Sequence, residues 1–291
     1  MKNIIVIIGP TGVGKTKLSV ELAKKIDAEI VNADSMQIYK ELNIGTAKIT
    51  EEEKENIPHH LFDIVNPDDM YTVYDYQKNG RKLLDELLTK NKKVIIVGGT
   101  GLYIKALLYN YEFKEETTSY DFSKFTNEEL LIKIKEYDNN TCIHINNRKR
   151  LERTLTKFLN NNETSSLGND KLYDFSIIGL TTDRNNLYNI INKRVDKMVE
   201  DGLIEEVKDL YDKKINSKAI NTGIGYKELY KYFNGEISLE ESIELIKKNS
   251  RRYAKRQYTF FNNQMDVKWF ETNYNDFNKT VEEVYSYLKG E

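Results

Sequence analysis

The sequence has only one cysteine, Cys142, and only three prolines and three histidines among its 291 residues. A single cysteine excludes an internal disulfide and a cysteine-rich zinc site, and the histidines are too few and too scattered to predict a metal centre. The first hydrophobic run is too short for a signal peptide, and no segment approaches the length of a membrane span. We therefore expect a cytoplasmic protein with no membrane partner, and nothing in the sequence requires a protein partner.

The sequence also has no large excess of positive or negative charge. The 44 lysines and arginines nearly balance the 46 aspartates and glutamates, which leaves a formal net charge of −2. A nucleic-acid-binding surface would therefore have to come from local clusters of basic residues. Hydrophobic residues make up 39% of the chain, which is enough for a core and argues against global disorder. The length suits one large domain, or one domain that carries a smaller insertion.

The N-terminal segment IIVIIGPTGVGKT predicts a phosphate-binding loop, or P-loop. Ile4 to Ile8 are consecutive apolar residues, typical of a strand buried on both faces, and the pattern Gly9-x-x-x-x-Gly14-Lys15-Thr16 follows. Its glycines allow backbone N–H groups to point inward at the start of a helix, which favours an anion. Lys15 adds a positive charge, and the Thr16 hydroxyl can ligate Mg²⁺. The residues alone leave open whose phosphate is bound.

The segments that follow predict an α/β fold. Short apolar strands are expected at residues 29–35, 94–97 and 175–183, and helical periodicity is present at 17–26 and 76–88. Such alternation is typical of a parallel sheet with helices on both faces.

A polar, asparagine-rich segment at residues 111–174 interrupts this alternation. We interpret it as a helical insertion with helices at 128–137 and 148–159. From residue 187 onward the chain is predicted to be mostly helical, with helices at 187–211, 226–233, 239–261 and 281–288.

Two further features could carry chemistry. Asp34 follows the second strand, where open α/β sheets place their ligands, although Asp-Ser is also good capping chemistry for a turn or helix. Residues 247–256 hold six basic side chains and no acid, and residues 148–157 hold five with one acid. Such clusters could bind RNA phosphates; alternatively, they form a helix face that is only exposed to solvent.

We interpret His59 and His60 as residues that pack or form hydrogen bonds with the backbone, rather than as catalytic residues.

Five segments together resemble the bacterial tRNA dimethylallyltransferases, also called tRNA isopentenyltransferases. The segments are GPTGVGKT, NADSMQIYKELNIGTAK, PHHLFDIV, VGGTGLYIKAL and GIGYKELYKYFNGEISLEESIELIKKNSRRYAKRQYTFF. The resemblance implies a P-loop NTPase-like parallel sheet with flanking helices and a helical insertion. Residues 1–111 with 175–291 would form the core and the C-terminal helices, and residues 112–174 would contact the tRNA anticodon arm.

The resemblance also implies a reaction, with Mg²⁺ as cofactor. A dimethylallyl group passes from dimethylallyl diphosphate to N6 of adenosine at tRNA position 37, just 3′ of the anticodon, in tRNAs that read codons beginning with U. The P-loop would then hold the donor's diphosphate. A small-molecule P-loop kinase is the alternative, and a non-catalytic P-loop RNA-binding module is a third hypothesis.

Site residues follow from matching the family's motifs. Asp34 matches the general base, Thr100 lies near the bridging oxygen of the donor, and Lys15 binds the diphosphate. The implied diphosphate ligands are Gly9, Pro10, Thr11, Gly12, Val13, Gly14, Lys15, Thr16 and Lys227, with Thr16 also on the metal. The implied tRNA contacts are Asp34, Ser35, Met36 and Gln37, then Lys149, Arg150, Leu151, Glu152 and Arg153, and finally Arg252, Lys255 and Arg256.

Overall fold

The computed structural model describes residues 1–113, 120–160 and 168–290 of the chain. The chain divides into two compact units, Met1–Leu108 with Leu172–Glu291 and Tyr109–Lys171. The insertion predicted from the sequence spans 112–174. Parts of that insertion, residues 114–119 and 161–167, lie outside the described residues.

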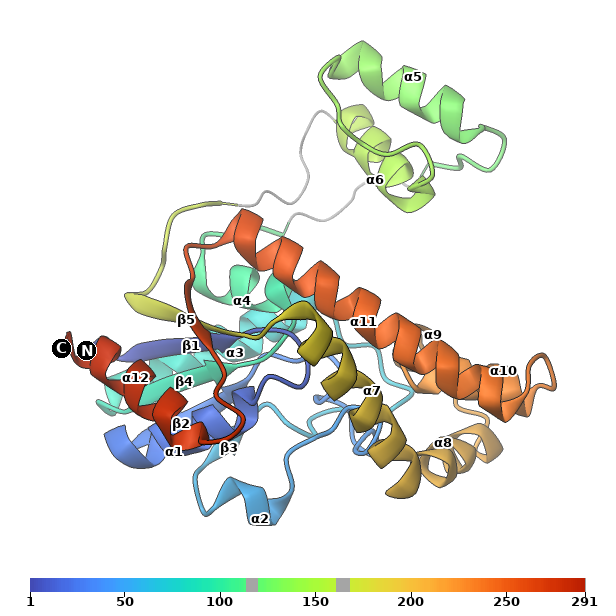
Figure 1. The fold of residues 1–291 in the computed structure, drawn as a ribbon. Helices are drawn as coiled ribbons and strands as arrows, with labels where there is room; N and C mark the ends of the chain where they lie inside the picture. Colours follow the sequence, from blue (N-terminus) through green and yellow to red (C-terminus); the bar gives the residue numbers. More distant parts are fainter. Residues whose placement is uncertain (114–119, 161–167, 291) are drawn as a thin grey trace. The chain divides into compact units, whose positions relative to one another are not determined.

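Parallel strands form one sheet in the described part of the larger unit, in the order β3-β2-β4-β1-β5-β6 (Figure 1). The strands are β1 (Ile4–Ile8), β2 (Ala28–Asn32), β3 (His59–His60), β4 (Lys93–Val97), β5 (Phe175–Thr181) and β6 (Lys268–Glu271). The predicted α/β class with a parallel sheet is confirmed. The edge strands β3 and β6 were not predicted, because segments of two and four residues are too short to carry a readable pattern.

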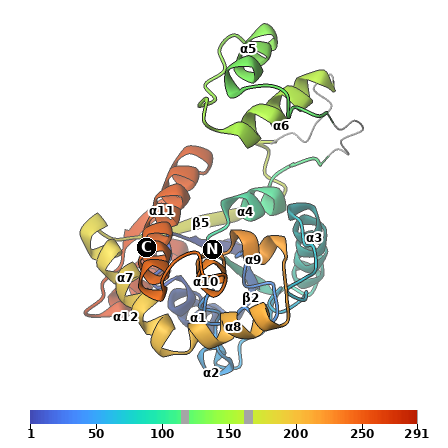
Figure 2. The ribbon, with the colours of Figure 1, turned by 90° about the vertical axis from the view of Figure 1, so that its right-hand side faces the viewer.

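Helices cover both faces of this sheet (Figure 2). Ile5 and Ile7 of β1 pack in one cluster with Leu22 and Val284, which belong to helices on one face. The alternate residues of β1 point to the opposite face, where α3 and α4 pack against each other. The helices of this unit are α1 (Lys15–Ile26), α2 (Glu51–Lys54), α3 (Val73–Thr89), α4 (Gly101–Leu108), α7 (Arg184–Glu200), α8 (Leu203–Asp212), α9 (Lys218–Thr222), α10 (Tyr226–Phe233), α11 (Leu239–Gln264) and α12 (Phe277–Lys289).

The helix predicted at residues 187–211 is two helices, α7 and α8. Gly202 separates them with a φ of 102°, a left-handed conformation that glycine adopts readily and that ends a continuous helix. Helices α2, α4 and α9 were not predicted. No helix in the described residues is long and apolar enough to cross a membrane.

The smaller unit contains the two helices expected from its periodicity, α5 (Asn127–Tyr137) and α6 (Arg148–Leu159). A capping box starts α5, because Thr126 accepts from the Glu129 N–H and the Glu129 side chain accepts from the Thr126 N–H. The two helices share a core that includes Leu130, Ile134 and Leu155.

Candidate active site

The polar residues singled out in the sequence follow three neighbouring strands. The P-loop follows β1, Asp34 comes two residues after β2 and Thr100 three residues after β4. Because carboxyl ends of parallel strands meet at one edge of a sheet, these segments converge. They border a cavity of about 300 Å³, here the central cavity, which is lined by Lys15, Thr16 and Asp34 among others.

The P-loop has the geometry of an anion site. Gly14 caps α1 in a left-handed conformation (φ 90°), and a Cβ there would lie 2.6 Å from the Phe277 ring. Among the described residues, none accepts a hydrogen bond from the backbone N–H groups of residues 11–14. Lys15 Nζ donates to the Pro10 carbonyl at 2.8 Å. Since Pro10 has no N–H, it contributes to this site by holding Lys15 rather than by donating to a phosphate.

The far end of the chain supports the P-loop. Thr272, 5% exposed, directly follows β6, and its hydroxyl donates to the carbonyl of Val13 at 2.9 Å. The Val13 side chain itself is fully buried in the core. The loop is thus held from β6 and from the start of α12.

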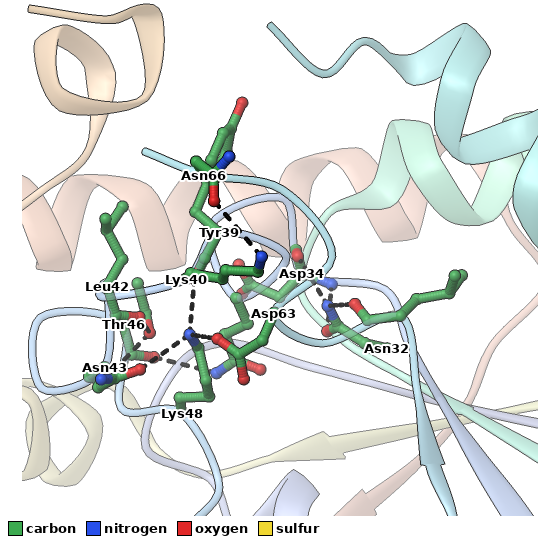
Figure 3. A network of polar contacts seen from close by, with 12 residues as sticks. Asn32, Asp34, Tyr39, Lys40, Leu42, Asn43, Thr46, Lys48, Asp63 and Asn66 are labelled. Atoms are coloured by element: carbon green, nitrogen blue, oxygen red, sulfur yellow. Dashed lines mark hydrogen bonds and ion pairs between the residues drawn. The ribbon is translucent and has the colours of Figure 1, made fainter. Parts of the chain in front are cut away.

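Asp34 is fixed by Asn32 (Figure 3). The Asp34 N–H donates to Asn32 Oδ1 at 2.8 Å, and Asn32 Nδ2 donates to the carbonyls of Asp34 and Leu61 at 3.1 and 2.9 Å. Asp34 Oδ1 accepts from the Met36 N–H at 2.9 Å, so the capping interpretation holds for this oxygen. Asp34 Oδ2 has no hydrogen-bond partner in the described part of the chain and is available to a substrate.

Thr100 joins the ends of β2 and β4. Its hydroxyl accepts from the Ser35 N–H at 3.0 Å and donates to Ser35 Oγ at 3.2 Å. Gln37 Nε2 donates to the carbonyls of Thr46 and Ala47, which leaves its Oε1 for a ligand. Ser35, Gln37 and the half-buried Met36 all line the central cavity.

The loop that holds Gln37 is itself anchored. Glu206 of α8 accepts from three successive N–H groups, those of residues 43–45, at 2.7 to 3.1 Å. Lys48 donates to the Tyr39 carbonyl, Asn43 Oδ1 and Asp63 Oδ1 (Figure 3). Burial lowers the pKa of Lys48, and Asp63 partly offsets this effect. One wall of the cavity is therefore rigidly attached to the core.

Two cations, Lys15 and Arg194, and one carboxylate, Asp34, line the central cavity. Burial, and then the nearby Arg194 guanidinium, lower the pKa of Lys15 to about 7, while Asp34 acts in the opposite direction. Burial also lowers the pKa of Arg194 and Asp34 raises it, and an arginine remains charged in proteins. No carboxylate of the described residues forms an ion pair with Lys15 or Arg194. Two half-buried cations without an ion pair indicate a site for an anion.

Arg194 was not predicted from the sequence. It lies on α7 one position before the buried Val195 and three after the buried Ile191. A cation at this helical spacing beside buried apolar residues is the signal that could have identified it.

Helix α11 brings basic and aromatic side chains to the same cavity. Arg252, Lys255 and Arg256 are exposed, and the Arg256 guanidinium lies 5.5 Å from the centre of the Tyr253 ring. Arg256 and Tyr253 both line the cavity. Lys227 of α10 also lines it and lies 3.7 Å from Glu228 Oε1.

In the smaller unit, α6 presents Lys149, Arg150 and Arg153 as exposed side chains. Leu151 is fully buried in the core of this unit, so its side chain packs between helices and does not belong to the basic surface. Glu152 is paired with Arg148.

The paired histidines have structural partners. His59 Nδ1 lies 2.8 Å from the Ile57 carbonyl, and His60 Nε2 lies 2.7 Å from Glu29 Oε2. These contacts agree with a packing and hydrogen-bonding role.

Known proteins match this chain over almost its whole length. A family model described as IPP transferase matches residues 37–264. A tRNA dimethylallyltransferase of Anoxybacillus flavithermus is 44% identical, over 99% of this chain and 97% of that protein. One of Bacillus cytotoxicus is 47% identical, over 99% and 95%. The chain belongs to the IPP transferase family.

Solved structures agree with membership in the IPP transferase family. The full-length tRNA isopentenylpyrophosphate transferase of Bacillus halodurans gives a TM-score of 0.79 at 40% identity, covering 100% of this chain and 96% of that one. A eukaryotic dimethylallyltransferase acting on tRNA gives 0.75 at 26% identity, covering 100% and 80%. The predicted family and its P-loop NTPase-like fold are confirmed, and the kinase alternative is not favoured.

Proposed function

We propose that the protein transfers a dimethylallyl group from dimethylallyl diphosphate to N6 of adenosine at tRNA position 37, in tRNAs that read codons beginning with U. The products are N6-isopentenyladenosine and diphosphate. Membership in the IPP transferase family supports this proposal. The structural observation that carries it is one cavity lined both by Asp34, which has an unpartnered oxygen, and by two cations, Lys15 and Arg194, that form no ion pair within the described residues.

In the proposed reaction, the N6 nitrogen bonds to C1 of the donor while the C1–O bond to diphosphate breaks. The electron pair of that bond leaves with the diphosphate, where negative charge grows. Lys15, Arg194 and the P-loop N–H groups stabilise this charge, and Lys227 is proposed to assist. Asp34 Oδ2 takes the proton that the nitrogen loses. Thr100 is proposed to lie near the bridging oxygen, held there by its bonds to Ser35.

Mg²⁺ is proposed to accompany the diphosphate, with Thr16 as its protein ligand. No group of three or more His, Cys, Asp or Glu side chains among the described residues could hold a metal ion. This suits Mg²⁺, which commonly keeps several waters and binds through substrate phosphates with one or two protein oxygens. When bound, the ion would neutralise part of the charge of the leaving diphosphate.

Recognition of the tRNA is proposed to combine an extruded base with phosphate contacts. Adenine must leave its stack to reach the cavity, which costs less in a single-stranded loop than in a duplex. Asp34, Ser35, Met36 and Gln37 would receive the base. The exposed cations of α6 and α11 would contact the anticodon arm.

A transfer assay tests the function directly. The protein is incubated with Mg²⁺, labelled dimethylallyl diphosphate and an unmodified tRNA that reads a codon beginning with U. Label on the RNA is the expected result. Nucleotide turnover without label on the RNA would establish the kinase instead, and RNA binding with neither activity would leave a binding module.

Binding of pyrophosphate is expected to take up a proton at Lys15. The pKa of this amine is about 7 in the free protein, and a bound anion raises it. Above about pH 7 the amine is mostly neutral, so its protonation on binding makes affinity fall with rising pH, by up to about tenfold per unit. Calorimetry at about pH 8, in two buffers of different ionisation enthalpy, measures the uptake. Lys15→Met is the control, because it retains only the protons that pyrophosphate exchanges; equal uptake in both proteins would contradict the prediction.

Removing exposed cations of α11 is expected to weaken tRNA binding and flatten its salt dependence. Each of Arg252→Ala and Arg256→Ala should reduce the slope of log K against log salt by about 0.7 to 0.9, the contribution of one phosphate contact. Arg251→Ala is a matched control, because the Arg251 guanidinium already donates to Asn192 Oδ1. An unchanged slope in both variants would mean that this cluster is a solvent-exposed helix face that does not contact RNA.

A further inference from the structure

Gln257 links helix α11 to the turn that carries Thr100. Its side chain is only 5% exposed, and Nε2 donates to the Gly99 carbonyl at 3.0 Å. A Cβ at Gly99 would lie 2.0 Å from this nitrogen and 4.0 Å from Asp34 Oδ2. The amide therefore fits against the turn only because residue 99 is glycine, and the turn itself lies next to the carboxylate proposed as the general base.

The orientation of this amide follows from its one partner among the described residues, because only Nε2 of a glutamine can donate a hydrogen bond to the Gly99 carbonyl. Tyr253, one turn earlier on the same helix, lines the same cavity, and burial, followed by Asp34, raises the pKa of its phenol to about 12.

The other atom of the amide, Oε1, is buried and has no hydrogen-bond partner in the described part of the chain. A buried acceptor without a partner costs free energy, whereas an apolar side chain at this position would leave the Gly99 carbonyl without its donor. The one hydrogen bond that Gln257 makes within the described residues is therefore the bond to the turn.

Helix α11 has two faces near Gln257. Arg256, the preceding residue, is exposed and belongs to the cations proposed to contact tRNA, whereas Gln257 reaches inward to the Thr100 turn. Thr100 in turn holds Ser35 through two hydrogen bonds. A continuous set of contacts thus runs from the basic face of α11 to the residues next to Asp34.

We propose that Gln257 is a positioning residue that aligns the Gly99–Thr100 turn with Asp34, and so connects the tRNA-binding helix to the reacting groups. The proposal rests on the proposed function, since its main readout is prenyl transfer.

Two substitutions test this role. Gln257→Met keeps the length of the side chain and removes the donor, and it is expected to lower kcat by about 10- to 100-fold, as expected for slight misplacement of reacting groups. The KM for tRNA should change less than about twofold, because no RNA-contacting group is removed. Gln257→Glu can donate to the Gly99 carbonyl only when protonated, so its kcat relative to wild type should rise as pH falls.

Lys105→Met is the matched control. Lys105 Nζ donates to the Gln264 carbonyl at 3.3 Å and so also connects α4 to α11, at the C-terminal end of α11. We expect near wild-type kcat for this variant. An unchanged kcat in Gln257→Met, or a Gln257→Glu profile parallel to wild type at all pH values, would overturn the proposal. Absence of transfer by the wild type would instead contradict the proposed function.

Discussion

Asp34→Asn is expected to slow prenyl transfer by about two to four orders of magnitude, the usual contribution of a positioned general base. Asparagine keeps the Oδ1 acceptor for the Met36 N–H, so the turn after β2 is retained. What is lost is a basic oxygen at the Oδ2 position, which has no partner in the described residues. The N6 nitrogen then has no group to take its proton, and the barrier rises.

Single-turnover transfer and tRNA binding, measured separately, check this expectation. Binding of tRNA should stay within about twofold of wild type, because one neutral contact replaces one charged contact of modest strength. Asp63→Asn is the matched control, since Asp63 belongs to the neighbouring network with Lys48 but does not line the cavity. Equal losses of binding and transfer in Asp34→Asn would instead assign Asp34 a purely structural role.

Arg194→Met is expected to reduce transfer by about two to three orders of magnitude, the effect of removing one donor that stabilises developing negative charge. The same change should leave Tm unchanged or raise it. Lys15 and Arg194 repel each other in the free protein, and Arg194 has no ion-pair partner among the described residues whose loss would destabilise the fold. Lower activity with equal or higher stability is the signature of a charge kept for function.

A second consequence distinguishes Arg194 from an ordinary structural residue. Because its charge lowers the pKa of Lys15, Arg194→Met should raise that pKa and shift the pH dependence of pyrophosphate binding upward. Lys193→Met is the control, because it removes an exposed cation from the neighbouring position of the same helix. A fall in both Tm and transfer, with the pH dependence unchanged, would contradict the assignment.

The sequence allowed the core of the fold to be predicted, because its signals are local. Five apolar residues before the P-loop identify β1, and the glycines of the P-loop identify the turn that follows this strand. Asp34 could be placed at the edge of the sheet because it closely follows a predicted strand, whereas Thr100 was assigned through the family's motif. The break between α7 and α8 was missed, since a single glycine decides it through one backbone angle.

Arg194 and Gln257 could not be predicted in the same way. Each reaches the cavity because a helix far along the chain packs against the rest of the core, and local periodicity does not specify the position at which that helix packs. Their only sequence signal is a polar side chain within a buried helical stripe. In α11, for example, Gln257 lies three residues after the buried Ala254 and four before the buried Phe261.

The hydrogen bond from Thr272 to Val13 has a consequence for biosynthesis. The ribosome makes the P-loop glycines long before it makes the Thr272 hydroxyl that braces the loop and the Phe277 ring beside Gly14. A nascent or prematurely terminated polypeptide that ends before β6 therefore lacks both braces. Only a chain translated past Phe277 can hold the P-loop with both braces.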